Sequence, residues 1–272
     1  MSRRPGWGFV GLGQMGLPMA ARLASAGLPV TALCHRPAHR DAALSIGAKP
    51  VDSIEGLATA CEVIGVCVRD DSQLFALMDR EGLLAQSRPG TLFVIHSTVA
   101  PQLCRQLAES AGHHDARLID APVSGLPVRA RNGTLTAFVG GADADVREAW
   151  SGLSTMASRI LHIGAVGSGQ TTKILNNLVS LSTVAAVAEA LRLAADLGLD
   201  TAAVRHALES ASADSFTLRH WDFFEGEWLS GGREAAAELV AKDLHLANSL
   251  DTTRPPLMAD AATHALRRHL GL

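Results

Sequence analysis

The chain has 272 residues, of which 47% are hydrophobic and 19% charged, and its formal net charge is -3. This composition excludes a disordered chain, and the near balance of acidic and basic residues argues against a nucleic-acid partner, which would require a basic excess. At roughly 150 residues per domain, the length favours two modest domains.

Short β-type runs alternate with helical spacing through the first part of the chain. Strands are expected at residues 7–10, 30–34, 63–68, 92–96, 117–120, 135–139 and 160–163. Helices are expected between most of them, for example over residues 15–26 and 101–111. This alternation predicts right-handed crossovers and a mostly parallel, doubly wound α/β sheet, whose ligands bind beyond the carboxyl ends of the strands.

A glycine-rich turn follows the first expected strand and leads directly into a helix. It reads Gly11, Leu12, Gly13, Gln14, Met15 and Gly16. In dinucleotide-binding proteins such glycines permit a tight turn, close approach of the backbone to a pyrophosphate, and close packing of the helix on the strand. The alternative is a tight turn with no ligand. The position of the motif, between a strand and a helix, favours a dinucleotide.

Basic residues follow the second expected strand, where an NAD enzyme usually carries a carboxylate for the ribose hydroxyls. His35 and Arg36 stand there, with His39 and Arg40 close behind. An arginine in this position can pair with the 2′-phosphate of NADP. We therefore expect NADP, with NAD as the alternative, unless this is only a solvated basic loop.

Polar residues follow later strands at the edge where nicotinamide and substrate should meet. Val68 ends the strand over 63–68, and Ser97 and Thr98 follow the strand over 92–96. Ser124 and Gly125 offer a hydroxyl and a backbone amide to a small carboxylate. The alternatives are a helix N-cap at Thr98 and a simple turn at Ser124.

The sequence pattern changes from alternating strands and helices to helices alone after residue 163, and we place the domain boundary between residues 164 and 165. A glycine-rich segment leads into an Ala/Leu-rich helix that ends near Gly198, and later helices are expected over 201–210, 235–250 and 259–270. No convincing strand follows, so residues 165–272 are predicted to be all-α. Lys173 and Asn177 lie four residues apart and share one face of the long helix. Four aromatic residues, Trp221, Phe223, Phe224 and Trp228, favour a core or a subunit contact.

Four segments together resemble the β-hydroxyacid dehydrogenase family, which includes 3-hydroxyisobutyrate dehydrogenases and tartronate semialdehyde reductases. Residues 11–20 are similar to its cofactor signature, and residues 120–125, continued by 133–135, to its substrate signature. Residues 167–169, with Lys173 and Asn177, resemble its catalytic signature, and Lys242 opens a segment similar to its late cofactor and substrate contact. The segments occur in the family's order and span nearly the whole chain.

The resemblance implies a Rossmann domain over 1–164 that binds NAD(P), and a helical substrate and dimerisation domain over 165–272. It implies reversible hydride transfer between the nicotinamide and a small 3-hydroxy acid or the matching semialdehyde. Lys173 would be the general acid/base, with Asn177 and Ser124 as further catalytic residues. Ser124, Gly125, Leu126, Lys173 and Asn177 would bind the substrate, and Lys242 the cofactor. Family members are dimers or tetramers, so a homodimer or homotetramer is expected.

The sequence also departs from the family, and two other functions stay open. Leu126 stands where the family has a second glycine, followed by Pro127 and Arg129, which makes the substrate uncertain. A catalytically silent NADP-binding sensor would be free to lose Lys173 and Asn177. An imine reductase shares the architecture but usually carries another residue at the lysine position.

Cysteine usage and hydropathy bear on the compartment. The chain has 4 cysteines and no CxxC pair, which indicates reduced thiols. We read no export signal before the glycine motif. The most apolar later stretch, residues 174–188, is interrupted by asparagine, serine and threonine, short of the roughly 18 apolar residues that a membrane span requires. A cytoplasmic protein with no membrane partner is expected.

Overall fold

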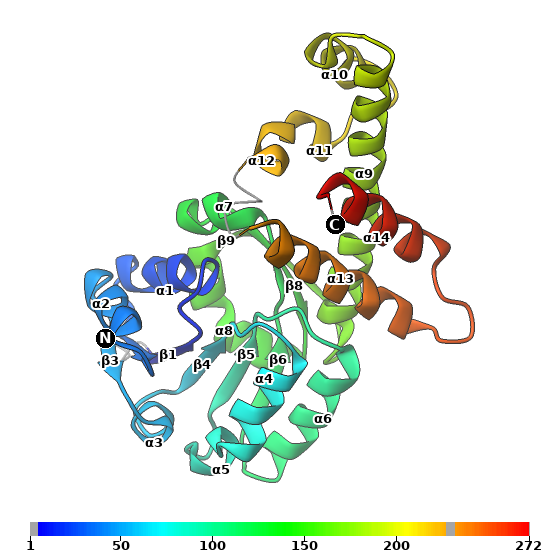
Figure 1. The fold of residues 1–272 in the computed structure, drawn as a ribbon. Helices are drawn as coiled ribbons and strands as arrows, with labels where there is room; N and C mark the ends of the chain where they lie inside the picture. Colours follow the sequence, from blue (N-terminus) through cyan, green and yellow to red (C-terminus); the bar gives the residue numbers. More distant parts are fainter. Residues whose placement is uncertain (1–4, 227–231, 272) are drawn as a thin grey trace. The chain divides into compact units, whose positions relative to one another are not determined.

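The computed structural model describes residues 5–226 and 232–271, and its fold is drawn in Figure 1. The chain divides into two compact units, Met1–Lys173 and Ile174–Leu272. The division falls inside one long helix, α9 (Ser168–Asp196), because the start of α9 hydrogen-bonds to residues of the first unit. The domain boundary predicted between residues 164 and 165 stays a prediction.

One sheet organises the described part of the first unit. Its strands are β1 (Trp7–Val10), β2 (Val30–Leu33), β3 (Lys49–Val51), β4 (Val63–Val66), β5 (Leu92–Ile95), β6 (Arg117–Asp120), β7 (Val123–Ser124), β8 (Leu135–Gly140) and β9 (Ala157–Gly164). The order is β3-β2-β1-β4-β5-β6-β8-β7, with β9 beside β8. The pairs from β3 to β6 are parallel, and β8 runs antiparallel to β6 and β7. The mostly parallel sheet is thus confirmed.

Helices cover both faces of this sheet. They are α1 (Gly16–Ser25), α2 (Pro37–Ser45), α3 (Ile54–Ala58), α4 (Asp71–Phe75), the π-helix η1 (Ala76–Arg80), α5 (Leu83–Gln86), α6 (Pro101–Gly112), α7 (Leu126–Asn132) and α8 (Asp143–Met156). Successive side chains of a strand point to opposite faces. In β5, Leu92 and Val94 accordingly join the core beneath α1 and α8, whereas Phe93 and Ile95 join the core beneath α3 to α6. The sheet is doubly wound.

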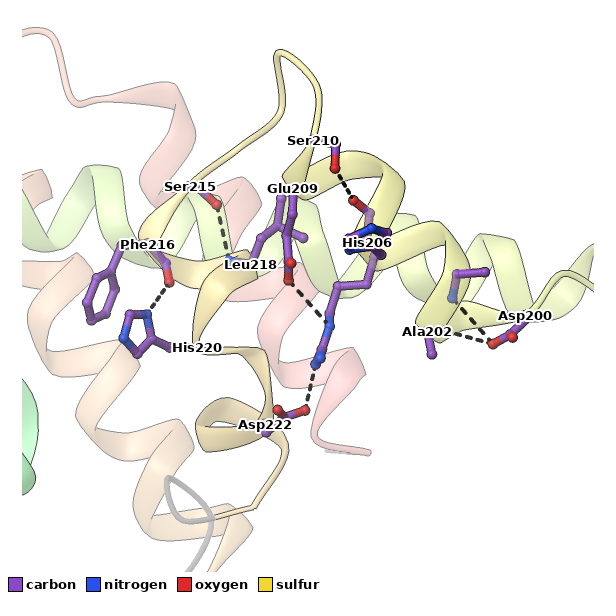
Figure 2. Close-up of polar contacts among 12 residues, drawn as sticks. Asp200, Ala202, His206, Glu209, Ser210, Ser215, Phe216, Leu218, His220 and Asp222 are labelled. Atoms are coloured by element: carbon purple, nitrogen blue, oxygen red, sulfur yellow. Dashed lines mark hydrogen bonds and ion pairs between the residues drawn. The ribbon is translucent and has the colours of Figure 1, made fainter.

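The second unit contains only helices and the loops that connect them among its described residues. After α9 come α10 (Thr201–Glu209), α11 (Phe216–Arg219), α12 (Trp221–Glu225), α13 (Arg233–Leu250) and α14 (Leu257–His269). Trp221 and Phe224 are buried in its core, Phe223 packs against them, and Trp228 lies outside the described residues. Figure 2 shows Asp200 capping α10 and Ser215 capping α11. Arg205 forms ion pairs with Glu209 and Asp222.

Helix α9 is apolar for much of its length. By length and composition it could cross a membrane, with a mean hydropathy of 1.6 over its most apolar window, of which 33% is buried. Core helices of soluble proteins pass the same test, and α9 supplies Val184, Val187 and Leu191 to the core of its unit. Other apolar residues of α9 are exposed, among them Val179 at 68%.

Candidate functional site

The turn after β1 has the geometry that a dinucleotide requires. Gly11 has a φ of +91°, and a Cβ there would lie 2.1 Å from the carbonyl oxygen of Cys67. A Cβ on Gly16 would lie 1.8 Å from the carbonyl oxygen of Gly11, whereas a Cβ on Gly13 would meet nothing within 4 Å. Gly11 and Gly16 are therefore required by the turn, and Gly13 leaves its backbone open to a ligand.

The start of α1 completes this cradle. α1 has no acidic residue in its first turn and no side-chain cap, so its positive end is available to a pyrophosphate. Of the other residues in the motif, Leu12 is buried, Met15 is half-buried and Gln14 is exposed. The residues present thus fit the diphosphate of a nicotinamide cofactor.

The end of β2 carries the basic pair that the sequence singled out. His35 and Arg36 are both exposed. Arg36 is the N-cap residue of α2, has an extended backbone, and makes no capping hydrogen bond with its side chain. Because its guanidinium does not cap α2, it can pair with a phosphate. The arrangement fits NADP and provides no carboxylate for the ribose of NAD.

The loop after β5 is held from two sides. Ser97 is only 3% exposed, and its Oγ accepts a hydrogen bond from the backbone N–H of Val68 at 2.8 Å. Its carbonyl oxygen accepts a second bond from Nε2 of Gln170 at 2.7 Å. The backbone N–H of Val99 donates to Oε1 of the same glutamine at 3.1 Å, and Thr98 lies half-buried between these contacts. Val68 and Ser97 are therefore neighbours, and the Ser97 hydroxyl can still donate its proton.

Strand β6 ends in a carboxylate that the sequence analysis did not select. Asp120 is fully buried, and its two oxygens accept hydrogen bonds from the backbone N–H groups of Gly167 and Gln170, both at 2.7 Å. Burial raises the pKa of Asp120 to about 6, against the opposing effect of these two bonds and of Arg105. The residue thus anchors the start of α9.

The predicted substrate cradle lies at the turn from β7 to α7. Ser124 and Gly125 are half-buried, and Gly125 has a φ of +141°. Leu126 has a φ of +66°, a region that a bulky side chain rarely adopts. A glycine would fit this backbone without strain, which agrees with the glycine that the resembled family carries here. The chain keeps a strained leucine beside the predicted carboxylate site.

Lys173 and Asn177 lie one turn apart on α9. Lys173 is 8% exposed, one of the few buried charged residues of the described chain. Nδ2 of Asn177 donates to Oδ2 of Asp243 at 2.8 Å, and Nζ of Lys242 lies 3.1 Å from Oδ1 of Asp243. Asp243 is 7% exposed, so this carboxylate holds an amide and an ammonium in a largely dry environment.

His96 is buried beside Ser97, and its chemistry is restrained. Burial lowers its pKa to about 4, so the ring is neutral at pH 7. Nδ1 lies 2.9 Å from the carbonyl oxygen of Ala121, which can only accept, so Nδ1 carries the proton. The ring stacks on Phe9. A buried, neutral histidine that packs against the core is a poor candidate for the acid/base group.

The structure therefore groups some of the predicted residues and leaves others apart. Val68 and Ser97 join through Gln170 to the start of α9, and Asn177 joins Lys242 through Asp243. No side-chain hydrogen bond in the described residues links Ser124 or Arg36 to either group. The sequence analysis gave no individual role to Asp120, Gln170 or Asp243, although Asp120 opens the segment similar to the substrate signature and Asp243 follows Lys242 in the late contact segment. A signal existed for Asp243, because it shares the buried stripe of α13 with Val240 and Ala247.

Two family models match nearly the whole chain. Residues 7–164 match the NAD binding domain of 6-phosphogluconate dehydrogenase. Residues 167–266 match the model described as NAD-binding of NADP-dependent 3-hydroxyisobutyrate dehydrogenase. A mitochondrial 3-hydroxyisobutyrate dehydrogenase of Pongo abelii is 32% identical over 96% of this chain and 80% of its own length.

Solved structures give the same result. The chain is similar to a 3-hydroxyisobutyrate dehydrogenase of Mycobacterium tuberculosis solved with L-serine, with a TM-score of 0.86, 28% identity, and coverage of 99% of this chain and 94% of the other. It is also similar to Psf3 in complex with NADP+ and 2-OPP, with a TM-score of 0.85, 27% identity, and coverage of 96% and 93%. A Streptomyces aurantiacus imine reductase, at 19% identity, a TM-score of 0.70 and coverage of 97% and 93%, shares the fold alone.

Proposed function

Since this chain belongs to the β-hydroxyacid dehydrogenase family and is an NAD(P)-dependent oxidoreductase that acts on a CH–OH group, we propose that it interconverts a small 3-hydroxy acid and its semialdehyde, with Lys173 moving the hydroxyl proton. The observation that carries the proposal is the buried amine of Lys173, one helical turn before Asn177. The named relatives support the substrate class, because 3-hydroxyisobutyrate and L-serine both carry a hydroxyl on C3.

The chemistry requires a proton acceptor beside the reacting carbon. The bound nicotinamide accepts or supplies the hydride. Loss of hydride from a carbinol carbon gives a carbonyl only if the hydroxyl proton also leaves, so a titratable group must reach that oxygen. The hydroxyls of Ser97 and Ser124 do not titrate usefully, the amide of Asn177 cannot exchange charge, and the chain has no tyrosine. Lys173 is the group that can take the proton and return it.

The remaining predicted contacts complete the proposal. Ser124 and Gly125 would bind the substrate carboxylate, with Leu126 beside them, and Asn177 would orient the substrate hydroxyl. The turn from Gly11 to Gly16, together with Val68, Ser97 and Thr98, would hold the cofactor. Lys242 would also contact the cofactor, and His35 and Arg36 would bind its 2′-phosphate.

A substrate panel tests the proposal directly. The protein is assayed with short 3-hydroxy acids, their semialdehydes and a cyclic imine, and turnover is followed by the absorbance of the reduced cofactor. We expect turnover of at least one 3-hydroxy acid or semialdehyde. Tight NADPH binding without turnover of any compound would identify a silent sensor instead, and preferential reduction of the imine would identify an imine reductase.

Arg36 determines the choice of cofactor in this proposal. Arg36→Ala removes a charge-assisted contact with the 2′-phosphate, so NADP(H) should bind more weakly by about 1.5–3 kcal/mol. NAD(H) lacks this phosphate and serves as the control ligand, whose affinity should not change. Titration of cofactor fluorescence measures both. A wild-type preference for NAD(H) that survives the substitution would contradict the phosphate contact.

Leu126 restricts the substrate in this proposal, and its strained backbone gives a second readout. Leu126→Gly relieves the positive φ, so the free energy of unfolding should rise by about 1 kcal/mol. The same change removes a side chain from the pocket, so turnover should extend to bulkier hydroxy acids. Asp115→Gly is the matched control, because Asp115 also has a positive φ, of 53°, but lies exposed before β6.

Urea unfolding and the substrate panel measure the two effects separately. A stabilised Leu126→Gly enzyme with an unchanged substrate profile would show that Leu126 points away from the pocket. Asp115→Gly should change stability only.

Self-association through α9 is part of the proposal. Val179 is 68% exposed and Leu175 50%, and apolar surface of this extent on one helix favours burial against a second copy. Sedimentation at micromolar concentration should show a dimer or tetramer, and Val179→Glu should shift it toward monomer. Leu257→Glu, at an equally apolar and 89% exposed position of α14, is the control. A wild-type monomer would contradict this part.

The state of the cysteines supports a cytoplasmic location, which is also part of the proposal. All the cysteines, Cys34, Cys61, Cys67 and Cys104, are free thiols, as a reducing cytoplasm would keep them. Fractionation of the native host cells measures the location, and recovery in an exported fraction would contradict it.

A further inference from the structure

The start of α9 is tied to the end of β6 by one buried carboxylate. Both oxygens of Asp120 accept hydrogen bonds, from the N–H groups of Gly167 and Gln170. N–H groups at a helix start have no partner within the helix. A residue about fifty positions earlier in the chain therefore caps α9, and it does so in the absence of solvent, because Asp120 is 0% exposed.

Gln170 ties the same turn to the loop after β5. Its side chain is 0% exposed and uses both ends of its amide on one loop, donating to the carbonyl oxygen of Ser97 and accepting from the N–H of Val99. A side chain held at two points cannot rotate without breaking a hydrogen bond. The first turn of α9 is thus fixed to the carboxyl ends of two adjacent strands.

The packing around these bonds leaves no space for adjustment. A Cβ on Gly140 would lie 2.5 Å from Oδ1 of Asp120, and a Cβ on Gly169 would lie 2.8 Å from Oδ2 and 2.4 Å from the carbonyl oxygen of Phe138. The start of α9 therefore packs directly against the backbone of β8.

Lys173 stands on the face that these contacts fix. Gln170, Lys173 and Asn177 follow each other at spacings of three and four residues, so they form one stripe along α9. Gln170 is held by the loop after β5, and Asn177 is held by Asp243 at 2.8 Å. Lys173 thus stands on α9 between two residues whose side chains are held by hydrogen bonds.

We infer that Asp120 and Gln170 are positioning residues for the reaction, because they fix the first turns of α9 and thereby determine where the amine of Lys173 lies. The inference rests on the proposed function, in which Lys173 exchanges the hydroxyl proton. Neither residue needs to touch the substrate. A displacement of about 1 Å in a reacting group can lower a rate by about 10²-fold, so the loss of this anchor should slow the chemical step.

Variants of Gln170 test the inference with little change in shape. Gln170→Leu removes both hydrogen bonds, and Gln170→Glu keeps the acceptor for Val99 but loses the donor to Ser97. We expect kcat to fall by about 10- to 100-fold for Gln170→Leu and by less for Gln170→Glu. The deuterium isotope effect on kcat should rise, because hydride transfer becomes more rate-limiting.

A matched control separates anchoring of α9 from helix capping in general. Asp200→Asn alters the exposed carboxylate that caps α10, shown in Figure 2, and should leave kcat unchanged. Asp120→Asn should lower kcat and also accelerate hydrogen exchange at the amides of Gly167 and Gln170, which is measured without substrate. Unchanged exchange in a folded Asp120→Asn protein would overturn the anchor.

A double-mutant cycle shows whether the effect passes through Lys173. In a Lys173→Ala background, Gln170→Leu should lower the residual turnover far less than it does in the wild type. An equal loss in both backgrounds would indicate a general structural defect and overturn the inference. If Lys173→Ala itself retains turnover, the assignment of Lys173 as the acid/base group is wrong and this positioning role falls with it. If hydrogen exchange is nevertheless accelerated in Asp120→Asn, then Asp120 anchors α9 but this anchor has no effect on catalysis.

Discussion

Lys173→Ala should lower kcat by about 10²- to 10⁴-fold while NADPH binding stays nearly intact. The expected loss reflects the removal of the group proposed to take the hydroxyl proton. Binding should persist because most of the proposed cofactor contacts lie on other elements, the turn after β1 and the loop after β5. Steady-state assays that follow the absorbance of the reduced cofactor give kcat, and fluorescence titration gives the NADPH affinity.

Two further lysine variants sharpen the result. Lys173→Arg keeps a positive charge but cannot release a proton at neutral pH, so it should be as inactive as the alanine variant. Lys49→Ala, in the edge strand β3, removes an exposed lysine and should change nothing. If Lys173→Ala retains most of its turnover with unchanged pH dependence, the acid/base group must be sought at Lys242 or His96. An active Lys173→Arg enzyme would reassign Lys173 to a purely electrostatic role.

The sequence predicted most of the sheet because its strands are apolar and bounded by turns. β1 and β6 have the predicted bounds, and α6 differs from its prediction by a single residue. The two missed strands lack that signal. β3 contains Pro50 and lies at the edge of the sheet, and β7 is two residues long, so its pairing with β8 rather than its own pattern defines it.

The candidate site was predictable where a motif is local in sequence. The roles of Gly11, Gly13 and Gly16 follow from a single turn, and the structure gives each the expected space. Asp120 and Gln170 could not be identified in this way, because their partners lie 47 to 73 residues away and only the folded sheet brings them together. Spacing rules describe neighbours on one element, not contacts between distant ones.

The long-range contact also alters the electrostatics at the start of α9. The positive end of a helix favours a negative charge beside it. Asp120 places a buried carboxylate at that end, bonded to the N–H groups of Gly167 and Gln170. Its negative charge offsets the positive potential of the helix end.

Acid titration should reveal two buried groups whose effects on stability oppose each other. His96 has its pKa lowered to about 4 by burial, so the folded state binds a proton less readily than the unfolded state. This contribution to stability is present above pH 6.5 and is lost as pH falls toward 4. Asp120 has its pKa raised to about 6 by burial, so the folded state binds a proton more readily. Its stabilising effect is lost as pH rises through 6 and is recovered on acidification.

Each group changes the free energy of unfolding by about 2 kcal/mol between pH 7 and pH 4.5. The two changes have opposite signs, so in the wild type they nearly cancel. The free energy of unfolding of His96→Asn should therefore rise by about 2 kcal/mol relative to the wild type on acidification, because only Asp120 of the two groups still titrates. Asp120→Asn should lose about 2 kcal/mol over the same interval. Arg105 also lowers the pKa of Asp120, but this residue is unchanged in these variants.

Urea unfolding at a series of pH values measures these differences, and the comparison with wild type cancels the titration of exposed carboxylates. Far-ultraviolet circular dichroism at pH 7 establishes that each variant is folded before its stability is compared. Glu189→Gln, which removes an exposed carboxylate of α9, is the control and should follow the wild-type curve closely. Curves for His96→Asn and Asp120→Asn that run parallel to the wild type would show that neither buried group titrates between pH 4.5 and 7.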